Sequence, residues 1–259
     1  SGALPQAVEA INKGYTIPPT SAAERPSVVG KILGSIGNEA EIEKLATVKN
    51  QTDTNMRVKS EIGLPNDAPI TRPSLETVRT NQGAVYNEVK KVPGNTIDGA
   101  FLRDVLDIDG AIASLKKKFP DIAKNDDVEK LITSLVPVHG VKGGMTSGDA
   151  VELTRVLRHR SAKNMNSDKP ELVELGSAQK DASNAIEGLL SRRMQNSGKL
   201  DLAEKWQTAR TKIAQSHFVE EALNPATGNV DAKKLGSFID KGMPFTGELN
   251  TAGRLGLAF

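Results

Sequence analysis

Apolar residues recur at intervals of three or four positions along most of this 259-residue chain. That interval places them on one face of an α-helix, and no stretch alternates apolar and polar residues over the length of a useful strand. The longest seams are Ala150, Leu153 and Leu157; Leu172, Leu175, Gln179, Ala182, Ile186 and Leu189; and Leu202, Trp206, Ala209 and Ile213. The pattern predicts an all-α fold, a multi-helix bundle of antiparallel amphipathic helices.

Residues typical of helix ends border these seams. Thr146 and Asp149 have the spacing of a capping box, and Pro170 stands in the first turn of the following helix. Ser74 is the candidate cap of an earlier helix. A short Asn-Ser-Gly-Lys turn at 196–199 separates the second seam from the third. Short connectors between long helices favour antiparallel neighbours.

The first part of the chain has a different pattern. Prolines in residues 15–26 favour an extended connector. Residues 38–63 then predict one long helix whose middle, residues 49–55, is wholly polar, as in helices that are solvated or await a partner chain. We therefore divide the chain into two parts. Residues 1–66 form a proline-rich, partly extended arm and a polar helix with a partner-docking role, and residues 67–259 form the helical bundle.

Composition narrows the class of protein. Aromatic residues make up only 3% of the chain, so the core must consist of aliphatic side chains and alanine. The chain has no cysteine, which excludes disulfides and thiolate chemistry. No run of about 18 apolar residues is present, so we expect no membrane-spanning segment. The Ser-Gly-Ala start resembles a tag remnant and the chain stops within an apolar run, so we expect a fragment of a longer protein.

Residue types that carry catalysis or bind metals form no working pattern. The three histidines lie far apart, at His139, His159 and His217. The aspartates of residues 104–109 place valine and lysine where a calcium loop needs oxygen ligands. Glu220 and Glu221 are adjacent on a predicted helix and therefore do not face each other. We predict no catalytic, cofactor-binding or metal site and no small-molecule substrate, and we expect a protein that is not an enzyme.

Basic residues gather in one region of the sequence. The candidate polyanion-binding residues are Arg155, Arg158, Arg160, Lys163, Arg192 and Arg193. Such a cluster neutralises phosphates without reading base sequence. The scarcity of aromatics leaves no platform for stacking single-stranded bases. A solvated helix face with acidic neighbours such as Glu152 and Glu187 is the structural alternative for the same residues.

Residues 219–242 contain the most conspicuous run of glycine, proline and asparagine. Asn224-Pro225 ends one helix, and Gly228-Asn229 offers a turn with positive φ. Asp231 is the expected N-cap of the next helix, with Val230 and Leu235 as a hydrophobic staple and Gly242 as its end. Because every conspicuous residue has a folding role, we predict a corner between two helices rather than a ligand loop.

Two motifs resemble a known group of proteins. They are Gly14-Tyr15-Thr16-Ile17-Pro18-Pro19-Thr20 and Leu223-Asn224-Pro225-Ala226-Thr227-Gly228-Asn229-Val230. The chain resembles an α-helical region of tailed-bacteriophage and prophage proteins, similar to the large virion-associated proteins of podovirus-like phages, of the internal, ejection or tail-associated type. The resemblance spans nearly the whole chain and brings no catalytic residue with it.

The resemblance implies a structural or DNA-delivery role in the virion, with assembly in the host cytoplasm. Its partners would be other virion proteins or further copies of the chain, with DNA as an additional candidate. The alternative function is a helical module that binds DNA or another polyanion through the basic residues.

Overall fold

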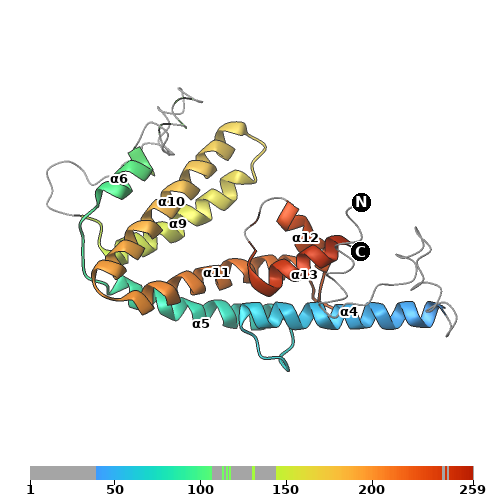
Figure 1. The fold of residues 1–259 in the computed structure, drawn as a ribbon. Coiled ribbons are helices and arrows are strands. Elements are labelled where there is room, and N and C mark those ends of the chain that lie inside the picture. The colour runs from blue at the N-terminus through green and yellow to red at the C-terminus, as the bar shows by residue number, and fades with distance from the viewer. Residues whose placement is uncertain are drawn as a thin grey trace. The chain divides into compact units, whose positions relative to one another are not determined.

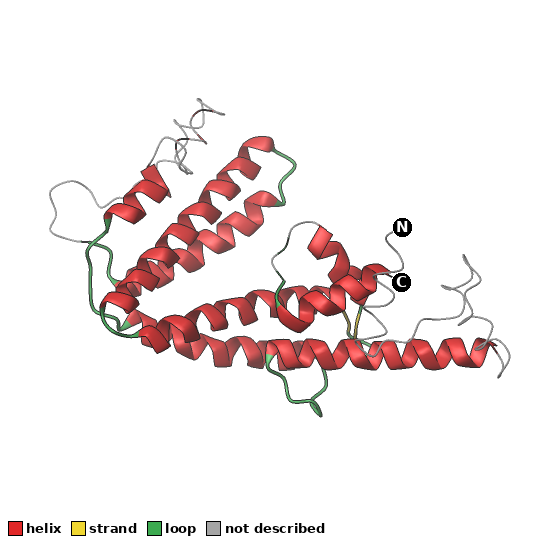
Figure 2. Cartoon of the chain, viewed as in Figure 1, coloured by secondary structure: helices red, strands yellow, loops and turns green. Residues whose placement is uncertain are grey.

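The computed structural model describes residues 39–106, 113, 115, 117, 130, 131, 144–240, 243 and 245–258. The predicted arm up to residue 38 lies outside them. Helices make up most of the described chain, and its two strands are two residues each (Figure 2). The elements are α4 (Glu39–Ile62), α5 (Arg72–Lys90), α6 (Gly99–Leu106), α9 (Ser147–Met165), α10 (Pro170–Asn196), α11 (Leu200–Ala222), β1 (Leu223–Asn224), β2 (Asn229–Val230), α12 (Ala232–Asp240) and α13 (Gly247–Ala258). The predicted all-α helical bundle is confirmed.

The chain forms two compact units. Unit 1 contains residues 1–82 and 209–259, and unit 2 contains residues 83–208. Unit 1 is therefore made from both ends of the sequence, and unit 2 is inserted between them. The sequence-based division into an arm with a polar helix (residues 1–66) and a helical bundle (residues 67–259) stays a prediction.

In unit 1, α4 packs against β2 and α13 (Figure 1). Val58 and Ile62 of α4 are fully buried, and Thr54 on the same side is nearly so. The other core residues of this unit are Ile70, Leu75, Val219, Ala222, Leu223, Val230, Leu235, Phe238, Phe245, Leu249 and Ala252. The C-terminal half of α4 is thus a core element of unit 1.

The polar middle of α4 is bound by the β1–β2 hairpin. Gln51 donates from Nε2 to the Val230 carbonyl at 2.9 Å. Asn55 donates to the Asn229 side-chain oxygen and accepts from the Val230 amide, both at 3.0 Å. The hairpin therefore binds Gln51 and Asn55, whereas Lys49 and Thr52 of the same stretch are exposed. Whether the stretch also meets a partner chain stays a prediction.

The corner at residues 223–231 is built largely as the sequence indicates. β1 and β2 pair antiparallel, and Gly228 closes the turn with a φ of 71°. Asp231 caps α12 by accepting from the Lys234 amide at 3.1 Å. Val230 and Leu235 are both fully buried. The sequence did not predict the small hairpin inside the corner, and Gly242 lies outside the described residues.

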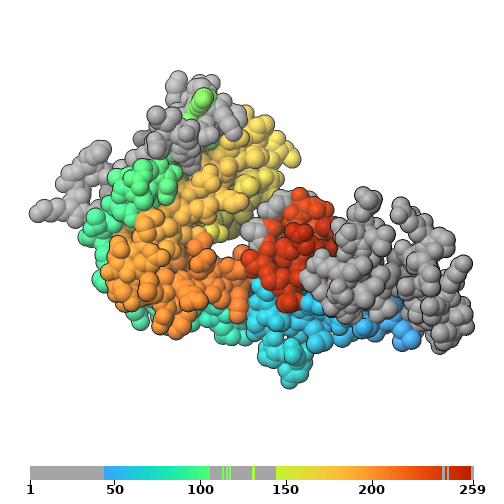
Figure 3. Space-filling model, in the orientation of Figure 1, coloured from blue at the N-terminus to red at the C-terminus, as the bar shows by residue number. Residues whose placement is uncertain are grey.

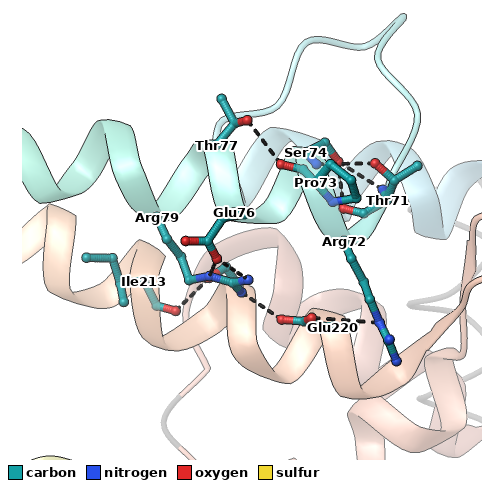
Figure 4. A network of polar contacts seen from close by, with 10 residues as sticks. Thr71, Arg72, Pro73, Ser74, Glu76, Thr77, Arg79, Ile213 and Glu220 are labelled. Carbon is teal, nitrogen blue, oxygen red and sulfur yellow. Dashed lines mark hydrogen bonds and ion pairs between the residues drawn. The ribbon is translucent and has the colours of Figure 1, made fainter.

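Polar contacts join α5 to α11 within unit 1 (Figure 4). The Arg79 guanidinium lies between two carboxylates, 2.9 Å from Glu76 and 2.8 Å from Glu220. Thr71 and Ser74 exchange hydrogen bonds at the start of α5: the Ser74 amide donates to Thr71 Oγ1, and the Thr71 amide donates to Ser74 Oγ. The residue ahead of the helix is thus Thr71, and the prediction of Ser74 as the cap is corrected to a reciprocal pair.

In unit 2, α9 and α10 lie side by side (Figure 1). Thr146 caps α9 by accepting from the Asp149 amide at 3.1 Å, as predicted. The helices touch at Gly176, where an added Cβ would come within 2.8 Å of the Met165 amide nitrogen and 3.0 Å of the Ser161 carbonyl oxygen. Ser161 Oγ donates to the Gly176 carbonyl at 2.7 Å. A side chain at this position would therefore push the two backbones apart.

The predicted seams of α9 and α10, with Leu202 and Trp206 of α11, lie in the core of unit 2, whereas Ala209 and Ile213 of the third seam belong to unit 1. Trp206 is 1% exposed and meets Tyr86 edge-on, with ring centroids 6.3 Å apart. The prediction of Trp206 as a core residue is confirmed. The seam residues buried in the same cluster are Ala150, Leu157, Leu175, Ala182, Ile186, Leu189 and Leu202.

Candidate interaction surfaces

One face of α4 exposes large apolar side chains. Leu45 is 68% exposed, Val48 56% and Met56 48%. With Thr52 between them, these residues recur at intervals of three or four positions along the helix. We call Leu45, Val48, Thr52 and Met56 the α4 apolar stripe. Part of α4 is visible at the surface in the space-filling view, in blue (Figure 3).

The predicted basic residues of α9 differ in whether their charges are already paired with carboxylates. Arg155, Arg160 and Lys163 are exposed. Arg155 lies 3.2 Å from Glu152 in an exposed pair, a type of contact that contributes little free energy. In the part of the chain that the structure describes, Arg160 and Lys163 form no ion pair. These three charges face solvent.

Arg158 is held by α10 instead. Its Nε and Nη2 donate to the two carboxylate oxygens of Glu187 at 3.0 and 2.8 Å. The Glu187 side chain is only 3% exposed, whereas that of Arg158 is 47% exposed. The guanidinium therefore compensates a buried carboxylate, and Arg158 has a structural role between the two helices.

Arg192 is also paired. Its Nε and Nη2 donate to the two oxygens of Asp98 at 2.6 and 2.8 Å. Asp98 Oδ1 accepts from the Phe101 amide at 2.8 Å, so this residue is also the N-cap of α6. The hydrogen bond from Arg192 lowers the pKa of Asp98, against the opposing effect of burial. The same bond raises the pKa of Arg192. Sequence analysis missed Asp98, although an Asp three residues before an apolar position is a recognisable cap signal.

Arg193 is buried. Its Nη2 donates to the carbonyls of Met145 and Thr96 at 2.6 and 3.0 Å, and its Nη1 donates to Ser147 Oγ at 3.3 Å. Burial lowers the pKa of Arg193. The side chain therefore holds together the segments leading into α6 and α9. Of the six predicted residues, Arg155, Arg160 and Lys163 are exposed on α9. Arg158, Arg192 and Arg193 instead bind groups within unit 2. Whether any of them binds a polyanion stays a prediction.

The remaining titratable residues are scattered. His159 and His217 are exposed on α9 and α11, and His139 lies outside the described residues. Within the described ranges, no three histidine or acidic side chains come together in a way that could hold a metal ion. Glu220 accepts from Arg79 and lies 3.8 Å from Arg72, so it is part of the α5–α11 network (Figure 4).

Comparison with known proteins identifies no relative: no family model, no curated protein and no solved structure matches this chain. Among the helices that the structure describes, none combines the length and the apolar character needed to cross a membrane.

Proposed function

We propose that this chain is a non-enzymatic assembly module that acts through protein–protein contacts, and that it belongs to the virion of a tailed bacteriophage. The α4 apolar stripe carries the first part of the proposal. Three large apolar side chains on one helix face, each about half exposed or more, favour association with another apolar surface. Their three-to-four spacing fits an amphipathic helix as partner. The virion part rests on the resemblance of residues 14–20 and 223–230 to phage proteins.

Ion pairs between helices elsewhere in the chain support a structural role. Arg79 joins α5 to α11, Arg158 joins α9 to α10, and Arg192 joins α10 to the cap of α6. These paired charges stabilise contacts between helices of one unit. The α4 apolar stripe is different, because its residues contribute little to the core of their own unit.

Light scattering tests the assembly role. We expect the mass to rise above the monomer value of 27.6 kDa as concentration increases. The double substitution Leu45→Lys and Val48→Lys should restore the monomer, because it places two charges on the stripe. The matched control is Thr77→Lys and Thr80→Lys on the exposed side of α5. A wild-type chain that stays monomeric at every concentration would contradict self-assembly.

A cysteine-free chain allows a second, site-specific test. Thr52→Cys introduces a single thiol in the middle of the stripe, and Thr80→Cys introduces one on α5. We expect cross-linking between copies at position 52 and none at position 80. Equal cross-linking at both positions would mean that the stripe is not the contact surface. Mass spectrometry of purified phage particles tests the virion assignment separately. We expect to detect the chain in the particles, and its absence would contradict the assignment.

A further inference from the structure

The solvent side of α9 carries a row of basic and polar side chains at regular spacing. Arg155, His159 and Lys163 follow one another at four-residue intervals, with Arg160 beside them, and all four are exposed. Four residues of α-helix rise about 6 Å, so the row presents its side chains at even steps along a rigid rod. We call these four residues the α9 basic ridge.

Acidic residues near the ridge are already neutralised. Glu152 accepts from Lys90 of α5 at 2.5 Å as well as from Arg155. The hydrogen bond from Lys90 lowers the pKa of Glu152 and keeps it ionised in this pair. Glu187 is compensated by Arg158. Arg160 and Lys163 form no ion pair among the described residues, so their charges remain available on the ridge.

The composition of the ridge identifies the type of partner. Protein interfaces have an apolar centre that is depleted of charge. The large apolar side chains exposed on α9 are two, Val156 at 36% and Met165 at 43%, so no apolar centre of that kind is present on the described helix. Met165 lies at the end of α9 next to Gly176 of α10. Single-stranded nucleic acid is bound largely by stacking on aromatic side chains, and α9 has no aromatic residue apart from the imidazole of His159.

We propose that the α9 basic ridge binds the phosphate backbone of duplex nucleic acid independently of base sequence. Arg155, Arg160 and Lys163 each neutralise a phosphate, and Arg155 exchanges its exposed pair with Glu152 for this contact. Arg158, Arg192 and Arg193 take no part, because their guanidinium groups are engaged within unit 2. The ridge lies on unit 2 and the α4 apolar stripe on unit 1, so each can be removed by substitution without changing the residues of the other.

Fluorescence anisotropy with a short labelled DNA duplex tests the proposal. Each phosphate contact contributes about 0.9 to the slope of log K against log salt, so three contacts predict a slope of about −2.7. Affinity should then fall roughly 40-fold between about 50 and 200 mM salt. Arg155→Gln, Arg160→Gln and Lys163→Gln should each reduce the steepness of the slope by about 0.9. The triple variant should lose binding.

Lys180→Gln on α10 is the matched control, because it also removes one exposed positive charge from a helix of unit 2. It should leave the slope unchanged. Absence of binding at about 50 mM salt would overturn the proposal. So would a slope that is the same in the triple variant and the wild type. If the ridge binds polyglutamate but not the duplex, its partner is an acidic protein surface and the nucleic-acid proposal is wrong.

Discussion

The close contact between α9 and α10 leads to a prediction about Gly176. Alanine in place of glycine within a helix normally stabilises it by about 1 kcal/mol. At Gly176 the new Cβ would lie 2.8 Å from the Met165 amide nitrogen and 2.9 Å from its Cγ, closer than ordinary van der Waals contact. Overpacking of this kind costs about 1–3 kcal/mol. Separation of the helices also stretches the hydrogen bond from Ser161, which contributes about 1 kcal/mol.

Gly176→Ala should therefore lower the free energy of unfolding of unit 2 by about 1–2 kcal/mol, despite its better helix propensity. Gly83→Ala in α5 is the matched control, because no other group lies within 4 Å of the added Cβ. This substitution should raise the free energy of unfolding by about 1 kcal/mol. The two variants change the same atoms but are expected to have opposite effects.

Urea unfolding followed by tryptophan fluorescence measures both variants. Trp206 is the single tryptophan of the chain and lies in the core of unit 2, so its emission reports on the unit that contains both glycines. A change in midpoint at constant m-value is a change in stability. If Gly176→Ala is as stable as the wild type, or if both variants shift the midpoint in the same direction, the close approach of α9 and α10 is not a tight constraint.

Three further predictions concern polar contacts. Asp98→Asn keeps a capping side chain but removes the ion pair with Arg192, and should cost less than about 1 kcal/mol near neutral pH because the pair is partly exposed. Since the folded-state pKa of Asp98 is lowered, its contribution is present above the unfolded value of about 3.9 and is lost as pH falls through the folded value. In urea titrations the difference between the two proteins should therefore begin to shrink below about pH 4 and vanish only once the pH is below the folded-state pKa of Asp98. A difference that does not shrink as the pH falls below about 4 would contradict the assignment. Arg158→Met should cost about 1–3 kcal/mol because it removes two hydrogen bonds from the buried Glu187, whereas Arg160→Met should stay within about 0.5 kcal/mol of the wild type in thermal melts. Asn55→Leu should cost about 1–3 kcal/mol because it leaves the Val230 amide without its acceptor, and hydrogen exchange at that amide should accelerate relative to the wild type.

The helices of unit 2 could be predicted because their signals are local. Thr146 and Asp149 are three residues apart, and the seam of α10 repeats within one helix. Trp206 could be assigned to the core because its seam continues through α11. Capping and amphipathic spacing depend only on residues that are near in sequence, so one chain is sufficient to recognise them.

The sequence could not show which polar residues are already bound. Gln51 and Asn55 find partners more than 170 positions away, and nothing near them in the sequence indicates this. The same holds for the candidate polyanion-binding residues. Arg192 pairs with Asp98 across 94 positions, whereas Arg160, which also lies in a basic stretch of the sequence, has no such partner in the described chain. The basic region is recognisable in the sequence, but which of its arginines are bound within the chain depends on the fold.

The insertion of unit 2 between the two halves of unit 1 has a consequence for synthesis. Residues 51 and 55 are made long before residues 229 and 230, to which they bind. Unit 2, whose residues are contiguous, can complete its core while the C-terminal residues of unit 1 are still on the ribosome. During that interval the buried side of α4 lacks its cover, in addition to the apolar stripe, which is exposed in the complete chain as well. A nascent chain that pauses at this stage exposes two apolar faces of α4 to chaperones. A ribosome-bound chain ending near residue 208 should therefore recruit chaperones more strongly than the finished protein.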